Sequence, residues 1–203
     1  MTFLNTLFFP AVRPFQFARR SCSGFTLIEL LVTLAIGGIL LTLTVPGFQV
    51  FFRDNRLATQ SNEFVASLHL AKSEAIRRGI RVSVCKSSDQ ATCSTAANWH
   101  QGWIVFADFQ DGQIGRPGAT GTINTPASQG YAADAIIRTN GALTSSTLAG
   151  GGTFDNWISF LPDGSTRGNG GLGNGTFTLC IANVSRSIIV NSAGRIRVTP
   201  GVC

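Results

Sequence analysis

The sequence predicts an α+β fold, in which a long N-terminal helix is followed by a domain of antiparallel strands. An apolar run at 25–45 is long enough for several helical turns and carries one ionisable side chain, Glu29. A helical pattern of apolar residues resumes within 47–79. From Ile80 onward the pattern becomes strand-like, and turns rich in Gly, Asn, Pro and Asp separate the apolar runs.

The first segment, 25–46, is predicted to cross a membrane once. Its first twenty-one residues would form a helix about 31 Å long at about 1.5 Å per residue, which is enough for a bilayer core. Arg19 and Arg20 precede it. Because basic residues stay on the cytoplasmic side, we expect a cytoplasmic N-terminus and an extracytoplasmic C-terminal domain. A charge in the membrane costs about 2.5–3.5 kcal/mol, so Glu29 is expected to have a partner.

The residues around this acid, Gly24-Phe25-Thr26-Leu27-Ile28-Glu29, resemble the class III signal of type IV pilins and type II secretion pseudopilins. In those proteins a prepilin peptidase of the inner membrane cuts after the glycine and methylates the new N-terminal phenylalanine. The resemblance implies that residues 1–24 are a cleaved cytoplasmic leader, that Phe25 is N-methylated, and that Glu29 pairs with the terminal amine of a neighbouring subunit during assembly. The alternative is an ordinary membrane anchor that happens to contain an acid.

The segment 47–79 is predicted to be the amphipathic half of the same helix. Apolar residues three, four or seven apart define one face: Leu57, Phe64, Leu68, Ala71 and Ala75. Polar residues, Lys72 among them, fall mostly on the other face. Gly79 is the expected helix stop.

Residues 80–203 are predicted to form a β-rich globular domain. The expected strands cover 81–86, 103–107, 136–138, 157–160, 176–181, 187–190 and 195–198. Asp108 and Asp111 are interpreted as turn residues, because the spacing of a calcium loop is missing. The long polar segments 112–133 and 141–152 are expected to be loops without regular structure.

Four cysteines remain after loss of Cys22 with the leader, and all of them lie in the predicted extracytoplasmic domain. An even number in an oxidising compartment favours disulfides, although the sequence leaves their connectivity open. We favour Cys85–Cys93 and Cys180–Cys203. A zinc site is the alternative, but no C-x-x-C pair is present, and neither a metal nor another cofactor is expected.

The chain carries no recognisable enzyme motif. A G-x-G-x-x-G pattern at 168–173 is not followed by a helix and is interpreted as a flexible loop. Neither histidine has an evident nucleophilic partner. Removal of the leader takes away three arginines, which leaves 13 basic and 10 acidic residues, or +3. Binding of an anion would therefore be local.

Further stretches resemble the FimT/GspH family of minor pilins. They are 55–57, 71–79, Val84-Cys85 with Cys93, 102–106 and Gly194-Arg195-Ile196-Arg197. The resemblance implies the type IV pilin fold, a subunit near the tip of a pilus or pseudopilus, and assembly with other pilins. In the FimT branch, a C-terminal G-R-x-R motif is linked to binding of DNA during natural transformation. The GspH branch suggests the alternative, a minor pseudopilin of type II protein secretion.

The arginine pair also has a simple physical interpretation. Residues two apart in a strand point to the same side, so Arg195 and Arg197 would present two guanidinium groups together, and Gly194 would permit the preceding turn. Two such groups suit phosphates of double-stranded DNA without reading its sequence. Arg186 and Arg138 are candidates to extend the patch. A solvated strand edge, protected from aggregation by charge, is the alternative.

Overall fold

The computed structural model describes residues 24–108 and 135–203, without the side chains of 43–47 and Gly170. The expected leader residues 1–23, Asp111 and the expected loop 112–133 lie outside this description. The chain divides into two compact units, Met1–Pro46 and Gly47–Cys203.

One α-helix, α1, runs from Leu27 to Arg78. At its start the Thr26 Oγ1 atom accepts a hydrogen bond from the Glu29 backbone N–H at 3.3 Å, which is the geometry of an N-cap. At its end Gly79 has φ +67° and donates its N–H to the Ala75 carbonyl at 3.0 Å. The expected glycine stop is therefore confirmed.

In the first unit, the large apolar side chains of α1 are exposed, from Leu27, which is 76% accessible, to Leu41, which is 63% accessible. The hydroxyls of Thr33 and Thr42 donate to carbonyls one turn earlier, at 2.9 and 2.7 Å, so these polar groups are satisfied within the helix. Within 24–108 and 135–203, no helix has a stretch sufficiently long and apolar to cross a membrane.

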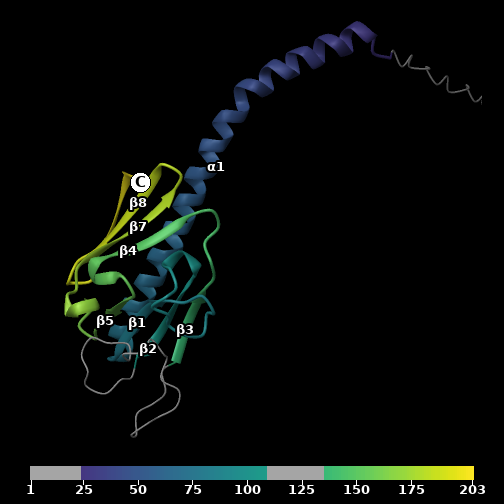
Figure 1. Ribbon diagram of the computed structural model, residues 1–203. Helices are drawn as coiled ribbons and strands as arrows, with labels where there is room; N and C mark the ends of the chain where they lie inside the picture. The colour runs from purple at the N-terminus through teal and green to yellow at the C-terminus, as the bar shows by residue number, and fades with distance from the viewer. Residues whose placement is uncertain (1–23, 109–134) are drawn as a thin grey trace, which may run out of the picture. The chain divides into compact units, whose positions relative to one another are not determined.

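The second unit contains two antiparallel sheets (Figure 1). The sequence predicted a strand-rich domain here but did not predict its division into two sheets. The five-stranded sheet has the order β3-β2-β1-β5-β6, and the four-stranded sheet has the order β4-β7-β8-β9. The strands are β1 (Arg81–Lys86), β2 (Trp103–Asp108), β3 (Ala135–Asn140), β4 (Thr147–Gly151), β5 (Trp157–Phe160), β6 (Thr166–Gly168), β7 (Gly175–Ile181), β8 (Val184–Val190) and β9 (Ile196–Val202). Within the described part of this unit, three 3-10 turns accompany them, at Trp99–Gln101, Gly152–Phe154 and Asn169–Gly171.

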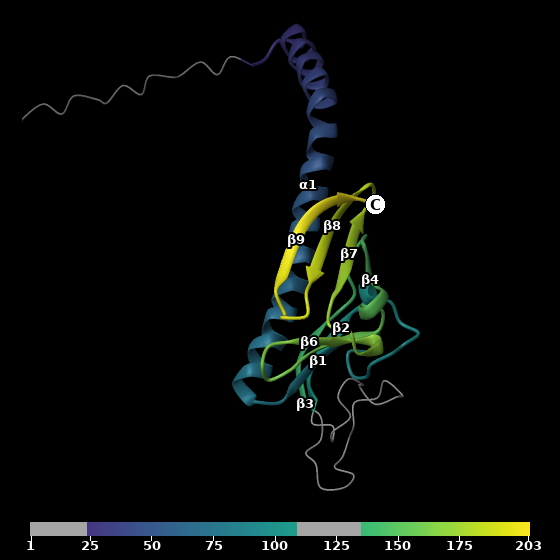
Figure 2. The same cartoon turned by 90° about the vertical axis from the view of Figure 1, so that its left-hand side faces the viewer.

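The second half of α1 lies along one face of both sheets (Figures 1 and 2). All five apolar positions that the sequence assigned to the inner face of the helix are at most 1% exposed: Leu57, Phe64, Leu68, Ala71 and Ala75. Phe64 is central, since its ring centroid lies 5.0 Å from that of Trp103 in β2 and 4.7 Å from that of Phe177 in β7. One aromatic side chain of the helix thus joins the two sheets in a single core.

Two expectations from the sequence are wrong. The segment 141–152, expected to be an irregular loop, contains β4, which pairs with β7 through Leu148 opposite Leu179. Asp108, interpreted as a turn residue, is buried at the end of β2, where its Oδ1 atom pairs with the Arg81 guanidinium at 2.7 Å. Both features depend on partners distant in the sequence, which local periodicity does not reveal.

Candidate functional site

The residues of the predicted processing signal lie at the start of α1. Gly24, Phe25 and Thr26 precede the helix, and all three are exposed. Phe25 is 84% accessible. Glu29 is also exposed and occupies the first helical turn, where the helix dipole favours a negative charge. The local arrangement therefore leaves the Gly24–Phe25 bond outside regular structure and the carboxylate exposed on the first turn.

At the other end of the chain, Arg195 closes a tight turn between β8 and β9. The Asn191 side chain accepts the Arg195 N–H at 2.8 Å, and the Asn191 N–H donates to the Arg195 carbonyl at 3.1 Å. The Gly194 N–H donates to the Asn191 carbonyl at 2.8 Å. Asn191 therefore fixes the backbone on both sides of Arg195.

The turn requires a glycine at position 194. It is buried and has φ +70°, in the left-handed region that favours glycine. A Cβ atom there would collide with the Gly164 carbonyl oxygen and lie 3.1 Å from the Lys72 Nζ atom. Both the backbone conformation and the close packing thus require glycine ahead of the arginines.

Lys72 of α1 holds the same turn and was missed by the sequence analysis, which placed it on the polar face of the helix. Its Nζ atom donates to the carbonyls of Ala193 at 3.2 Å and Gly194 at 2.9 Å. On the other side, the Thr166 hydroxyl of β6 donates to the Asn191 carbonyl at 2.8 Å. The turn is therefore fastened to the helix and to the five-stranded sheet.

The arginine side chains themselves are exposed. Arg197 lies opposite Ile189 in the β8–β9 ladder, whereas Arg186 lies opposite Pro200. Because side chains alternate between faces, Arg186 is on the opposite face of the sheet from Arg197. Arg138 is exposed on β3, in the other sheet. The structure thus exposes both Arg195 and Arg197, and it places Arg186 on the other face from Arg197 and Arg138 in the other sheet.

Both cysteine pairs that the sequence favoured are disulfides. Cys85 and Cys93 have Cα atoms 5.6 Å apart, and Cys180 and Cys203 have Cα atoms 6.0 Å apart. The second disulfide fastens the end of β9 to β7, so the strand that carries Arg197 is covalently tied to the sheet at its far end. Among the described residues, no three His, Cys, Asp or Glu side chains are grouped as metal ligands.

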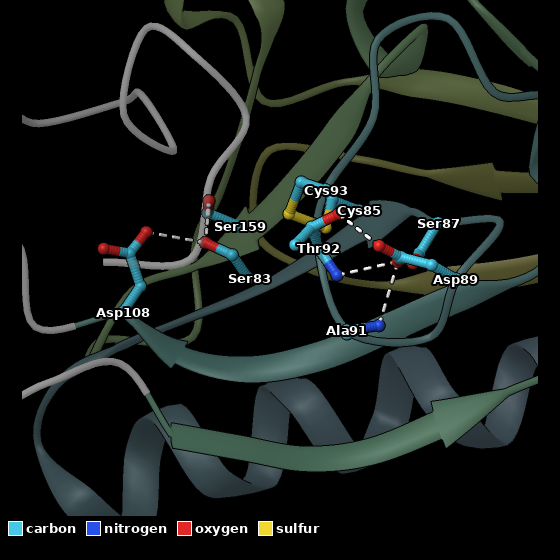
Figure 3. The surroundings of a disulfide bond; sticks show 9 residues. All are labelled: Ser83, Cys85, Ser87, Asp89, Ala91, Thr92, Cys93, Asp108 and Ser159. Carbon is cyan, nitrogen blue, oxygen red and sulfur yellow. Dashed lines mark hydrogen bonds between the residues drawn. A yellow bond between two sulfur atoms is a disulfide. The ribbon is translucent and has the colours of Figure 1, made fainter. Parts of the chain in front are cut away.

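The Cys85–Cys93 disulfide closes a short loop organised by Asp89 (Figure 3). Its carboxylate accepts the Thr92 hydroxyl at 2.6 Å, the Thr92 N–H at 2.8 Å and the Ala91 N–H at 3.0 Å. The Ser87 hydroxyl donates to it at 2.9 Å. These bonds, the Thr92 hydroxyl foremost, lower the pKa of Asp89 well below its ordinary value of 3.8.

This carboxylate gives a pH-dependent prediction. Because the pKa of Asp89 is lower in the folded protein than in the unfolded chain, the ionised carboxylate stabilises the folded state. This stabilisation is complete above the ordinary pKa and is lost as the pH falls toward the lowered pKa. We therefore expect the loop to open only in strong acid, and Asp89→Ala to open it at neutral pH. Faster hydrogen exchange of Ala91 and Thr92 would report the opening. The internal control is a second turn, in which the Asp163 carboxylate accepts the Ser165 N–H at 2.9 Å and exchange should not change. Unchanged exchange in Asp89→Ala would contradict the assignment.

Comparison with known proteins gives two matches to family models. The model described as type II transport protein GspH matches residues 60–194, and the model described as prokaryotic N-terminal methylation motif matches residues 19–45. The first match covers most of the second unit. The second covers the glycine, phenylalanine and glutamate of the predicted processing signal.

Comparison with solved structures matches two crystal structures of the type IV minor pilin FimU of Pseudomonas aeruginosa strain PAO1. The structure in space group P21 has a TM-score of 0.50 at 18% identity, covering 75% of this chain and 96% of that chain. The structure in space group P65 has a TM-score of 0.47 at 17% identity, covering 72% and 97%. No curated protein sequence gives a significant match. The similarity to the first of these structures, together with the helix and the two sheets, gives the type IV pilin fold.

Proposed function

This chain belongs to the GspH family of pilin-like proteins, and from that premise we propose that it is a minor type IV pilin that binds extracellular DNA through Arg195 and Arg197. Membership of the family, together with the N-terminal methylation motif, implies processing by a prepilin peptidase and assembly with other pilins or pseudopilins. The family is one of structural subunits, and we infer no catalytic activity.

For the N-terminus, the proposal is cleavage between Gly24 and Phe25, followed by methylation of Phe25. The exposed apolar side chains of α1 support a single-pass anchor at 25–46 in a bacterial inner membrane, with the second unit in the periplasm before assembly. The proposed anchor includes 43–46, whose side chains the structure does not describe. Glu29 would pair with the amine of a neighbouring subunit, because a carboxylate in lipid needs a partner.

The observation that carries the DNA proposal is the construction of the Arg195 turn. Two exposed guanidinium groups follow a buried glycine, and the turn is held by Asn191 and Lys72. This arrangement exposes both charges two residues apart on a backbone that hydrogen bonds hold in place. Guanidinium groups on a fixed backbone suit phosphate oxygens, which accept their hydrogen bonds in parallel pairs.

The test is the dependence of DNA binding on salt. In the full-length protein in nonionic detergent, Arg195→Ala/Arg197→Ala should weaken binding of a mixed-sequence duplex at low salt. It should also reduce the slope of log K against log salt by about 1.8, because each phosphate contact contributes about 0.9. Fluorescence anisotropy of a labelled duplex measures both quantities.

Arg138→Ala is the matched control, because Arg138 is also an exposed strand arginine but lies in the other sheet. It should leave both affinity and slope close to those of the unaltered protein. Equal affinity and slope in the double variant and the unaltered protein would remove the DNA proposal and leave membership of the family intact.

A second candidate function is that of a minor pseudopilin in type II protein secretion, which the description of the matching family model favours. Its partners would be other pseudopilins and exported proteins. Deletion of the gene separates the two functions. Loss of natural transformation with normal protein secretion supports the pilus, whereas lost secretion with normal transformation supports the pseudopilus.

A further inference from the structure

We propose that DNA rests on the exposed part of the outer face of the four-stranded sheet, the face turned away from α1, rather than on the arginine pair alone. This inference rests on the proposed DNA binding and defines its surface. The part of the outer face considered as the binding surface comprises Arg197 and Thr199 of β9, Ser187 and Ile189 of β8, and Thr176 and Thr178 of β7, with Arg195 just before β9. Figure 2 looks onto these strands with α1 behind them.

Strand register places these residues in two neighbouring rows. In the first row Arg197 lies opposite Ile189, and Ile189 lies opposite Thr176. In the second, Thr199 lies opposite Ser187, and Ser187 lies opposite Thr178. Neighbouring strands are about 4.8 Å apart, so the second row is a line of three hydroxyl groups running across the sheet beside the arginine row.

The residues that alternate with these side chains along the strands establish which way the two rows face. Phe177, Leu179, Ile188 and Val190 alternate with them along β7 and β8, and all four are buried in the core shared with α1. The hydroxyl side chains therefore point away from the core, and Thr176, Thr178, Ser187 and Thr199 are each partly exposed. Beside the arginines, this face therefore offers a partner a set of partly exposed hydroxyl groups.

The charge of this region fits a polyanion. From Gly164 to Cys203 the sequence contains no aspartate or glutamate, and of its four arginines Arg197 lies on this face with Arg195 just before β9. None of the four strands of this sheet carries an acid. Serine and threonine hydroxyls commonly bond phosphate oxygens alongside arginine. A phosphate backbone lying across the two rows would thus meet donors without meeting a repelling carboxylate.

The same face lacks the groups that read or stack bases. Phe177 is the only aromatic residue in the four strands, and it points into the core. Binding of single strands relies on aromatic platforms. The face is therefore suited to the backbone of a duplex, whose charge density is also higher than that of a single strand.

Charge substitutions in the hydroxyl row test the surface. In the full-length protein in nonionic detergent, Thr178→Glu should weaken binding of a mixed-sequence duplex on the order of tenfold at low salt, because a carboxylate then faces the phosphates. Thr178→Lys should tighten binding and increase the salt slope by about 0.9, as one added phosphate contact does. The lysine variant keeps the test decisive if the glutamate variant fails to fold.

Thr139→Glu is the control, because Thr139 is an exposed strand threonine in the other sheet. It should bind the duplex like the unaltered protein, and a single strand of equal length should bind more weakly than the duplex. If both Thr178 variants bind like the unaltered protein while Arg195→Ala/Arg197→Ala loses binding, the surface is wrong and the arginine site stands. If the double arginine variant also binds normally, the proposed function itself fails.

Discussion

Gly194→Ala is expected to abolish most DNA binding although both arginines remain. An alanine in the left-handed region costs about 1–2 kcal/mol. At this position the new methyl group also collides with the Gly164 carbonyl and crowds the Lys72 ammonium. The Asn191–Arg195 turn must then move, and the backbone that positions the two guanidinium groups moves with it. Duplex binding by anisotropy and thermal unfolding of the same sample measure the two consequences.

Gly79→Ala provides a matched control for this prediction. Gly79 also has a positive φ, +67°, but a Cβ atom there meets nothing within 4 Å. It should therefore show the cost of the backbone conformation alone and keep normal DNA binding. If Gly194→Ala and Gly79→Ala are equally stable, and Gly194→Ala binds DNA normally, then packing against Gly164 does not position the arginines.

Phe64→Ala is expected to have the largest effect on stability, about 3–5 kcal/mol. Phe64 is fully buried, and its ring contacts Trp99, Trp103 and Phe177 in edge-to-face geometry. Truncation leaves a cavity where the helix joins both sheets. Because small domains are stable by only about 5–15 kcal/mol, a large part of the total would be lost. Urea unfolding followed by tryptophan fluorescence measures the change.

The same substitution at Phe52 is the control. Phe52 belongs to the same helix but is 63% exposed. Its replacement should change the free energy of unfolding by no more than about 0.5 kcal/mol. Similar losses at Phe64 and Phe52 would contradict the assignment of Phe64 to the centre of the core.

Much of the fold follows from the sequence because its signals are local. The spacing of Leu57, Phe64 and Leu68 identified the buried face of α1, and Gly79 identified its end. The strands with apolar alternation were found in the right order. Two strands were missed. β4, Thr-Leu-Ala-Gly-Gly, offers no alternating pattern and forms a strand only by pairing with β7. β6 has only three residues, too few to show a pattern, and pairs with β5.

The candidate site was predicted only where its sequence signal is local. The motif Gly194-Arg195-Ile196-Arg197 is contiguous and therefore visible in the sequence. Lys72, which holds the turn, lies 122 residues from Gly194, and no local pattern links them. Arg186 was grouped with the arginine pair because the sequence alone does not give the register of β8 against β9, which places it on the other face.

Intact-mass and N-terminal peptide analysis of the protein extracted from membranes tests the central claim most directly. A processed minor pilin would begin at Phe25 and carry one methyl group on its terminal amine, with residues 1–24 absent. A chain that retains the Gly24–Phe25 bond and has an unmodified N-terminus would contradict the account, because Glu29 would then have no neighbouring N-terminal amine to meet during assembly.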